Sequence, residues 1–210
     1  MLLCSRQWGK STVSAVKAVH HAWTRPGSLV LVACPVLRQS AEWLRKAEGF
    51  VRKLKIRTVG DGDNTQSVKF PNGSRIVALP GTEATVRGFS AVSLLLIDEA
   101  ARVSDELYKS LRPVLAASDG DLWLMSTPNG KQGFFHDEWT EGGEEWERVR
   151  GPATECPRIR PEFLEEERRK LGEVWFNQEY LCEFGDNGGS LFPLDLVRPL
   201  VSAEIEGLEL

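Results

Sequence analysis

Long apolar runs are missing from this chain of 210 residues. Its longest apolar stretches, residues 29–34 and 94–97, are far shorter than the roughly 20 residues that a membrane-spanning helix needs. The first residues, Met-Leu-Leu-Cys-Ser-Arg, also lack the basic-then-apolar order of a secretory signal peptide. We therefore expect no membrane partner and a protein that stays inside the cell that makes it.

An excess of basic residues is missing as well. The chain has 26 Lys and Arg residues against 30 Asp and Glu residues, a formal net charge of -4. This balance argues against a protein that coats nucleic acid, although a local basic patch is compatible with transient DNA contact. The four cysteines form no Cys-x-x-Cys pair and no zinc spacing, which indicates incidental reduced thiols. With 41% hydrophobic and 27% charged residues, the composition is that of one globular domain.

Short apolar runs alternate with stretches of helical periodicity along the first 150 residues. This order predicts an α/β fold, a doubly wound and mostly parallel sheet flanked by helices. A Pro-Asn-Gly turn between two of the runs indicates one hairpin. The expected strands are residues 1–3, 29–33, 68–70, 75–79, 94–97 and 122–125. The expected helices are residues 11–23, 40–54 and 104–115, with Ser40 and Ser104 as caps of the last two.

The character of the sequence changes beyond residue 150. Pro161 begins a charged helix, and residues 186–190, Asp-Asn-Gly-Gly-Ser, have the composition of a linker. We therefore expect a core over residues 1–150, a small helical C-terminal subdomain over residues 151–185, and a linker with the start of another domain over residues 186–210. The second helix of the subdomain is expected to carry Trp175, Phe176, Tyr180, Leu181 and Phe184.

A candidate phosphate-binding loop, Cys-Ser-Arg-Gln-Trp-Gly-Lys-Ser, occupies residues 4–11 between an expected strand and an expected helix. In that context the pattern Gly-x-x-x-x-Gly-Lys-Ser/Thr binds phosphate through backbone N–H groups at a helix N-terminus. Lys10 would reach the outer phosphates, although Cys4 replaces the first Gly and the tripeptide alone also fits a solvated helix start. The nucleotide-binding residues of this interpretation are Ser5, Arg6, Gln7, Trp8, Gly9, Lys10, Ser11 and Thr12.

Two adjacent carboxylates, Asp98 and Glu99, follow the apolar run at residues 94–97. Ligands of open parallel sheets bind at the carboxyl ends of the strands. There Asp98 and Ser11 can hold Mg²⁺, and Glu99 can orient and deprotonate the water that attacks the γ-phosphate. Alone, the acidic pair is also compatible with a plain polar exit from the sheet. Together with the loop, it supplies both halves of a site for ATP and Mg²⁺.

The order of the motifs resembles the ATPase domain of the large terminase subunit of tailed bacteriophages. In that family's variant phosphate loop the first Gly is commonly missing and an Arg occupies the apex, as Arg6 does here. Ser-Thr-Pro after a buried strand looks like the family's coupling motif, and Asp-Glu-Ala-Ala like its acidic motif. The resemblance covers nearly all of residues 1–192, with ordered motifs at residues 5–11, 79–81 with 86–89, 98–101, 126–128 and 178–184.

The resemblance adds roles to the residues already named. Arg6, together with Lys10 and Glu99, is expected to be catalytic, stabilising charge on the transferred phosphate, although its place also fits a surface Arg. Ser126 and Thr127 would couple the nucleotide state to the movement of DNA, or else cap the end of a strand. Arg87 is a candidate arginine finger within the subunit or across a ring interface, or a plain turn residue.

The resemblance also implies partners and a location. Hydrolysis of Mg²⁺-ATP would drive double-stranded DNA into a preformed capsid. The implied partners are double-stranded DNA, the portal protein and the small terminase subunit. The chain would form a homo-oligomeric ring when assembled and be a monomer alone. The location would be the cytoplasm of the infected bacterial host, at the portal vertex of the procapsid.

Two regions that the resembled family carries have no counterpart in this sequence: an adenine-contacting region before the phosphate loop and a C-terminal nuclease. We therefore expect a fragment, a truncated prophage gene or a chain with a misplaced start. Two other functions stay open. One is a non-catalytic remnant that binds nucleotide or DNA, and the other is a helicase-like translocase, which would need a second ATPase lobe.

Overall fold

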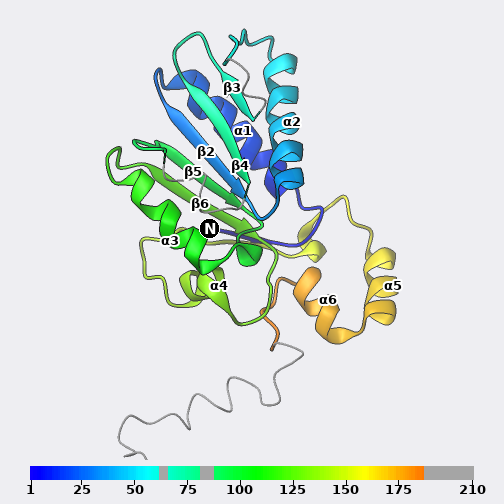
Figure 1. Cartoon of the computed structure of the whole chain (residues 1–210). Coiled ribbons are helices and arrows are strands. Elements are labelled where there is room, and N and C mark those ends of the chain that lie inside the picture. Colours follow the sequence, from blue (N-terminus) through cyan, green and yellow to red (C-terminus); the bar gives the residue numbers. More distant parts are fainter. Residues whose placement is uncertain (62–65, 81–87, 187–210) are drawn as a thin grey trace, which may run out of the picture.

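A computed structural model gives the structure of the protein and describes residues 1–61, 66–80 and 88–186. Its strands within these residues form one sheet in the order β3-β4-β2-β5-β6-β1-β7 (Figure 1). All neighbouring strands pair in parallel except β3 and β4, which form the expected antiparallel hairpin. The strands are β1 (Leu2–Cys4), β2 (Leu29–Cys34), β3 (Ser67–Lys69), β4 (Arg75–Pro80), β5 (Leu94–Asp98), β6 (Asp121–Ser126) and β7 (Val149–Gly151).

Helices cover both faces of the sheet (Figure 1). They are α1 (Lys10–Thr24), α2 (Leu37–Lys53), α3 (Asp105–Leu111), α4 (Gly133–Thr140), α5 (Pro161–Leu171) and α6 (Glu173–Glu179), with short 3-10 turns η2 (Ala100–Arg102), η3 (Arg112–Leu115) and η4 (Ala153–Glu155). Among the described residues, no helix has both the length and the apolar character needed to cross a bilayer. The alternation of strands and helices therefore produces the expected α/β architecture.

The two faces of the sheet carry separate apolar cores, because side chains alternate along each strand. On β5, Leu94 and Leu96 pack with α1 and α2, whereas Leu95 and Ile97 pack with α3 and α4. All four side chains are completely buried. A strand buried on both faces explains why the run at residues 94–97 is apolar without interruption. It also fixes where the chain leaves the sheet, at Asp98.

The C-terminal helices form a small unit of their own, beside the loop that joins β1 to α1 (Figure 1). Its core consists of Ala153, Leu164 and Phe176. Just after β7, Ala153 N donates to Tyr180 O at 2.7 Å. From the loop, Arg6 N donates to Glu179 O at 3.4 Å. The helical subdomain is therefore placed against the loop between β1 and α1.

Several local expectations from the sequence were wrong. Ser40 does not cap α2, which begins after Val36. It lies inside the helix, where its Oγ donates to Leu79 O at 2.7 Å. The helix capped by Ser104 ends at Leu111 and continues as a 3-10 turn, since Pro113 supplies no N–H.

The second C-terminal helix also ends earlier than expected, at Glu179, so Tyr180, Leu181 and Phe184 follow it. Helix α4 and the edge strand β7 were missed altogether. Arg87 and most of the expected linker, residues 187–190, lie outside the described residues.

Candidate functional site

The loop between β1 and α1 turns sharply before the helix begins. Gly9 has a φ of 105° and precedes Lys10, the first residue of α1, and Gln7 also has a positive φ of 63°. Glycine adopts such a conformation without steric cost, which explains the Gly at position 9. The turn presents the N-terminus of a helix of 15 residues at the carboxyl end of β1, where the helix dipole favours an anion.

A cavity of about 510 Å³ opens in front of this helix N-terminus. Its charged walls are four cations, from Arg6, Lys10, Lys46 and Arg158, and one carboxylate, from Glu99. The cavity therefore has a strong positive excess, although the chain as a whole is acidic. A positive, polar cavity at a helix N-terminus is a site for a polyanion such as a nucleoside triphosphate.

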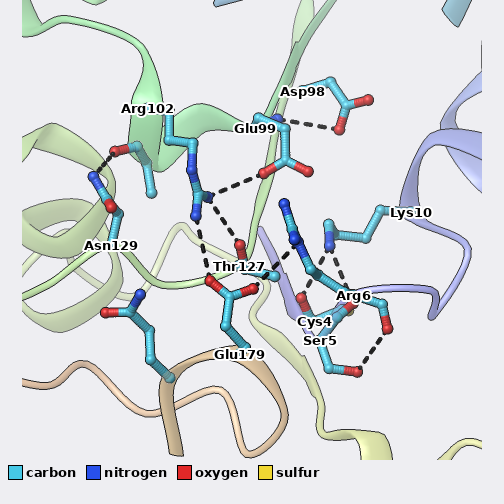
Figure 2. Close-up of polar contacts among 12 residues, drawn as sticks. Cys4, Ser5, Arg6, Lys10, Asp98, Glu99, Arg102, Thr127, Asn129 and Glu179 are labelled. Carbon is cyan, nitrogen blue, oxygen red and sulfur yellow. Dashed lines mark hydrogen bonds and ion pairs between the residues drawn. The ribbon is translucent and has the colours of Figure 1, made fainter. Parts of the chain in front are cut away.

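The side chain of Lys10, the first residue of α1, is held by the loop before the helix. Its Nζ is buried and donates to Cys4 O at 3.0 Å and to Ser5 O at 3.2 Å (Figure 2). These two carbonyls fix the ammonium group at the base of the cavity, where its charge can meet phosphate oxygens. The same charge opposes the effect of burial on the neighbouring Cys4 thiol, whose pKa is raised chiefly by desolvation.

Ser11 and Asp98 meet at the end of β5. Ser11 Oγ donates to Asp98 Oδ2 at 2.7 Å, and the carboxylate is buried. Burial raises the pKa of Asp98, and the hydrogen bond from Ser11 opposes that rise. A hydroxyl and a carboxylate in contact are oxygen donors of the kind that Mg²⁺ takes when substrate phosphates and water complete its shell. In the described part of the chain, no cluster of three or more His, Cys, Asp or Glu side chains could hold a metal unaided.

Glu99 follows Asp98 with a left-handed backbone, φ 52° and ψ 43°. A non-glycine residue in this conformation is strained by roughly 1–3 kcal/mol, a feature common at functional sites. The turn sends the two acidic side chains in different directions (Figure 2). Asp98 contacts Ser11, and Glu99 lines the cavity that Lys10 also lines. A carboxylate at the cavity wall is placed to act on a water molecule beside a bound phosphate.

Arg102 joins three parts of the molecule. Its Nη1 donates to Thr127 Oγ1 at 2.9 Å and lies 3.3 Å from Glu99 Oε2, and its Nη2 lies 3.5 Å from Glu179 Oε1 (Figure 2). The other carboxylate oxygen of Glu179 lies 3.2 Å from Arg6 Nε. The Glu179 side chain is only 8% exposed. Charged contacts therefore connect the loop, the acidic turn, the end of β6 and α6.

The structure brings most of the expected residues to one place. Arg6, Gln7, Gly9, Lys10, Ser11, Thr12 and Glu99 line the cavity, and Asp98 lines a smaller one of about 120 Å³ beside it. Ser5 is buried, and Trp8 packs away from the cavity, where its Nε1 donates to Pro152 O at 2.9 Å.

The two residues of the expected coupling motif do not line the cavity. Thr127 contacts Arg102, and Ser126 Oγ is buried without a hydrogen-bond partner among the described residues.

Three charged residues of the site, Lys46, Arg102 and Arg158, were missed from the sequence. The ion pairs of Glu179 were missed as well. Arg158 Nη2 donates to Gln7 O at 3.0 Å and to Trp8 O at 2.9 Å, about 150 positions away along the chain. No local sequence pattern predicts such a contact. Arg102 had a weak signal, because it lies three residues after Glu99 on the turn that follows the strand.

Comparisons with known proteins identify the family and the fold of the chain. The family model described as "Terminase large subunit, T4likevirus-type, N-terminal" matches residues 1–198. The chain belongs to the large terminase subunit family. It is 25% identical over 199 residues to the large terminase subunit of Escherichia phage T5, covering 90% of this chain and 44% of that protein. It is 24% identical over 222 residues to that of Thermus virus P23-45, covering 89% and 46%. This terminase chain thus spans less than half the length of these relatives.

Solved structures share the fold of the terminase chain. The large terminase ATPase domain of Thermus phage P74-26 aligns with a TM-score of 0.71 and 21% identity, over 88% of this chain and 87% of that one. The large terminase of another thermophilic bacteriophage, in complex with ADP, aligns with a TM-score of 0.73 and 12% identity, over 88% and 48%. The expected fold class, a mostly parallel sheet flanked by helices, is confirmed.

Proposed function

We propose that this terminase chain binds ATP with Mg²⁺ in the cationic cavity and hydrolyses it. The observation that carries the proposal is the contact of Ser11 Oγ with Asp98 Oδ2, 2.7 Å apart, beside a cavity lined by both Lys10 and Glu99. Phosphate-binding cations, oxygen donors for Mg²⁺ and a carboxylate base are the parts that phosphoryl transfer to water requires. The large terminase of the thermophilic bacteriophage described above has been solved with ADP and with ATP-gamma-S, which supports a nucleotide as the ligand.

Each residue of the cavity has a distinct task in this proposal. The N-terminus of α1 and Lys10 bind the phosphates, and Arg6 offsets the negative charge that grows on them in the transition state. Glu99 accepts a proton from the attacking water. Mg²⁺, when held at Ser11 and Asp98, would neutralise charge on the phosphate oxygens. Arg102 keeps the Glu99 carboxylate at the wall of the cavity through its contact at 3.3 Å.

We further propose that hydrolysis drives double-stranded DNA into a capsid. The contacts of Arg102 with Thr127 and Glu179 support this coupling, because they join the catalytic turn to the end of β6 and to the helical subdomain. The partners proposed are double-stranded DNA, the portal protein and the small terminase subunit. The assembled state is a ring of identical chains, the free chain is a monomer, and the location is the portal vertex in the cytoplasm of the infected bacterium.

Phosphate release from ATP tests the catalytic part of the proposal. The purified chain is expected to release phosphate with Mg²⁺ present and to stop when EDTA removes the metal. Addition of excess Mg²⁺ should restore the rate, which excludes damage by the chelator. A chain that binds ATP but releases no phosphate under any of these conditions would be a non-catalytic remnant.

A further inference from the structure

A second cavity lies beside the cationic one and differs from it in chemistry. It has a volume of about 460 Å³, within the range of roughly 300–1,000 Å³ typical of small-molecule sites. Arg6, Gln7 and Arg158 line both cavities, so the two are continuous along the phosphate loop. The remaining walls come from the helical subdomain: Ile159, Arg160, Phe163 and Tyr180. The second cavity therefore keeps arginines in its walls and adds two aromatic rings, which the cationic cavity lacks.

The aromatic walls are held in place on one side and open on the other. Tyr180 lies against Phe176, with ring centroids 5.3 Å apart, and its hydroxyl donates to Glu167 Oε2 at 2.8 Å. Phe163 meets Tyr180 edge to face, at 6.2 Å and 78°. Even so, Phe163 is 40% exposed. Phe163 thus offers an aromatic surface that its own subdomain does not cover.

Arg158 forms the border between the two cavities. Its Nη2 donates to the carbonyls of Gln7 and Trp8, so the guanidinium is fixed against the back of the phosphate loop. A guanidinium plane and aromatic rings are the groups on which nucleic-acid bases stack. Within the described part of the chain, no carboxylate lines this cavity, and its amide group comes from Gln7. The walls therefore suit a flat, uncharged aromatic ring.

We propose that this second cavity binds the base of the nucleotide whose phosphates lie at residues 5–12, with Phe163 as the principal stacking residue. This inference rests on the proposed function, because it requires the phosphates to lie in the cationic cavity. Stacking accepts any base, since every base has a π face. A bound nucleotide would then join the phosphate loop to the helical subdomain through its base.

Phe163→Ala tests the base site, with Mg²⁺-ATP and inorganic tripolyphosphate as the two probes. The substitution should weaken ATP binding about tenfold, within the range measured for loss of a base-stacking ring, and leave tripolyphosphate binding within about twofold. Trp175→Ala is the matched control: Trp175 is an aromatic residue of α6, 58% exposed and not a wall of the cavity. It should change neither affinity. Because Phe163 is also partly exposed, both variants should fold, and their melting temperatures provide a check.

Two outcomes would overturn the base site alone. One is an unchanged ATP affinity in the folded Phe163→Ala variant. The other is an equal loss for ATP and tripolyphosphate, which would show that Phe163 only supports the loop. A parent chain that binds neither probe contradicts the proposed function itself, and with it the base site. If the parent binds both probes, the phosphate site is supported, and the Phe163→Ala result then tests the base site separately.

Discussion

The proposed nucleotide site of this terminase chain comprises the two adjoining cavities. It has a strand half, formed by the loop after β1 and the end of β5, and a subdomain half, formed by residues that follow β7, and the two halves are held differently. In the strand half, Lys10 and Asp98 are buried, and their hydrogen bonds are 2.7–3.2 Å long. In the subdomain half, Arg158 is exposed, although its hydrogen bonds to Gln7 O and Trp8 O are 2.9–3.0 Å long, and the ion pairs of Glu179 are 3.2–3.5 Å long. The strand half is therefore fixed by buried polar contacts, whereas the subdomain half is held against the loop by contacts that include an exposed arginine.

Glu99→Gln should have the largest effect, because it removes the proposed general base of hydrolysis from the strand half and keeps the size of the side chain. Turnover of ATP should fall by roughly 10²–10⁴-fold, the range for a lost general base. The dissociation constant for ATP should change little. Phosphate release and equilibrium binding measure the two quantities. Glu106→Gln, an exposed acid on α3, is the control. A Glu99→Gln variant that hydrolyses ATP at the parent rate would show that Glu99 is not the base.

Lys10→Ala should have the next largest effect, on binding. Loss of a charged hydrogen-bond donor costs about 1.5–3 kcal/mol, so ATP binding should weaken roughly 10- to 150-fold. Adenosine, which carries no phosphate, should bind as it does to the parent. Lys53→Ala, in the last turn of α2, is the control. Equal losses for ATP and adenosine would contradict a phosphate role for the strand half.

Arg102→Gln tests the junction between the two halves. Arg102 does not line the cavity, so KM for ATP should stay within about twofold. Without its contact to Glu99, kcat should fall about tenfold, which corresponds to one weakened charged hydrogen bond. Arg102→Lys should recover part of kcat, since it keeps the charge but cannot reach all three partners.

Arg45→Gln, on the exposed side of α2, is the matched control for Arg102→Gln. A rise in KM with an unchanged kcat would mean that Arg102 serves binding instead of positioning Glu99. Steady-state kinetics at several ATP concentrations separate these results.

The same division into halves explains what could be predicted from the sequence. Lys10 and Ser11 begin the helix that follows one short loop, and Asp98 and Glu99 lie where one strand ends. Local order along the chain therefore places these residues correctly at the edge of a parallel sheet. Asp98 lies next to Ser11 because β5 ends, and α1 begins after β1, at the same edge of the sheet.

The rest of the site depends on tertiary contacts that no local pattern encodes. Arg158 reaches Gln7 from an irregular segment, and Lys46 reaches the cavity from the middle of α2. Ser40 misled the prediction for a related reason: a serine suited to capping a helix instead donates to Leu79 O on the neighbouring strand. Thr127 was expected to couple the nucleotide state to the movement of DNA, and the structure places it in contact with Arg102, a side chain whose direction depends on the turn after Glu99.

The smallest expected effect is the choice between ATP and GTP. The cations of the strand half meet phosphates, which the two nucleotides share, and the described walls of the base cavity offer stacking surfaces with no carboxylate to select among base edges. The two affinities should therefore differ by less than about tenfold, because one hydrogen bond more or less is worth about 1 kcal/mol. Competition of each nucleotide against a fluorescent ATP analogue measures the ratio. Phe163→Ala should weaken ATP and GTP alike. A preference for ATP of 100-fold or more would instead require a hydrogen-bonding partner for the adenine edge. The subdomain half would then select adenine and would not stack on any base alike.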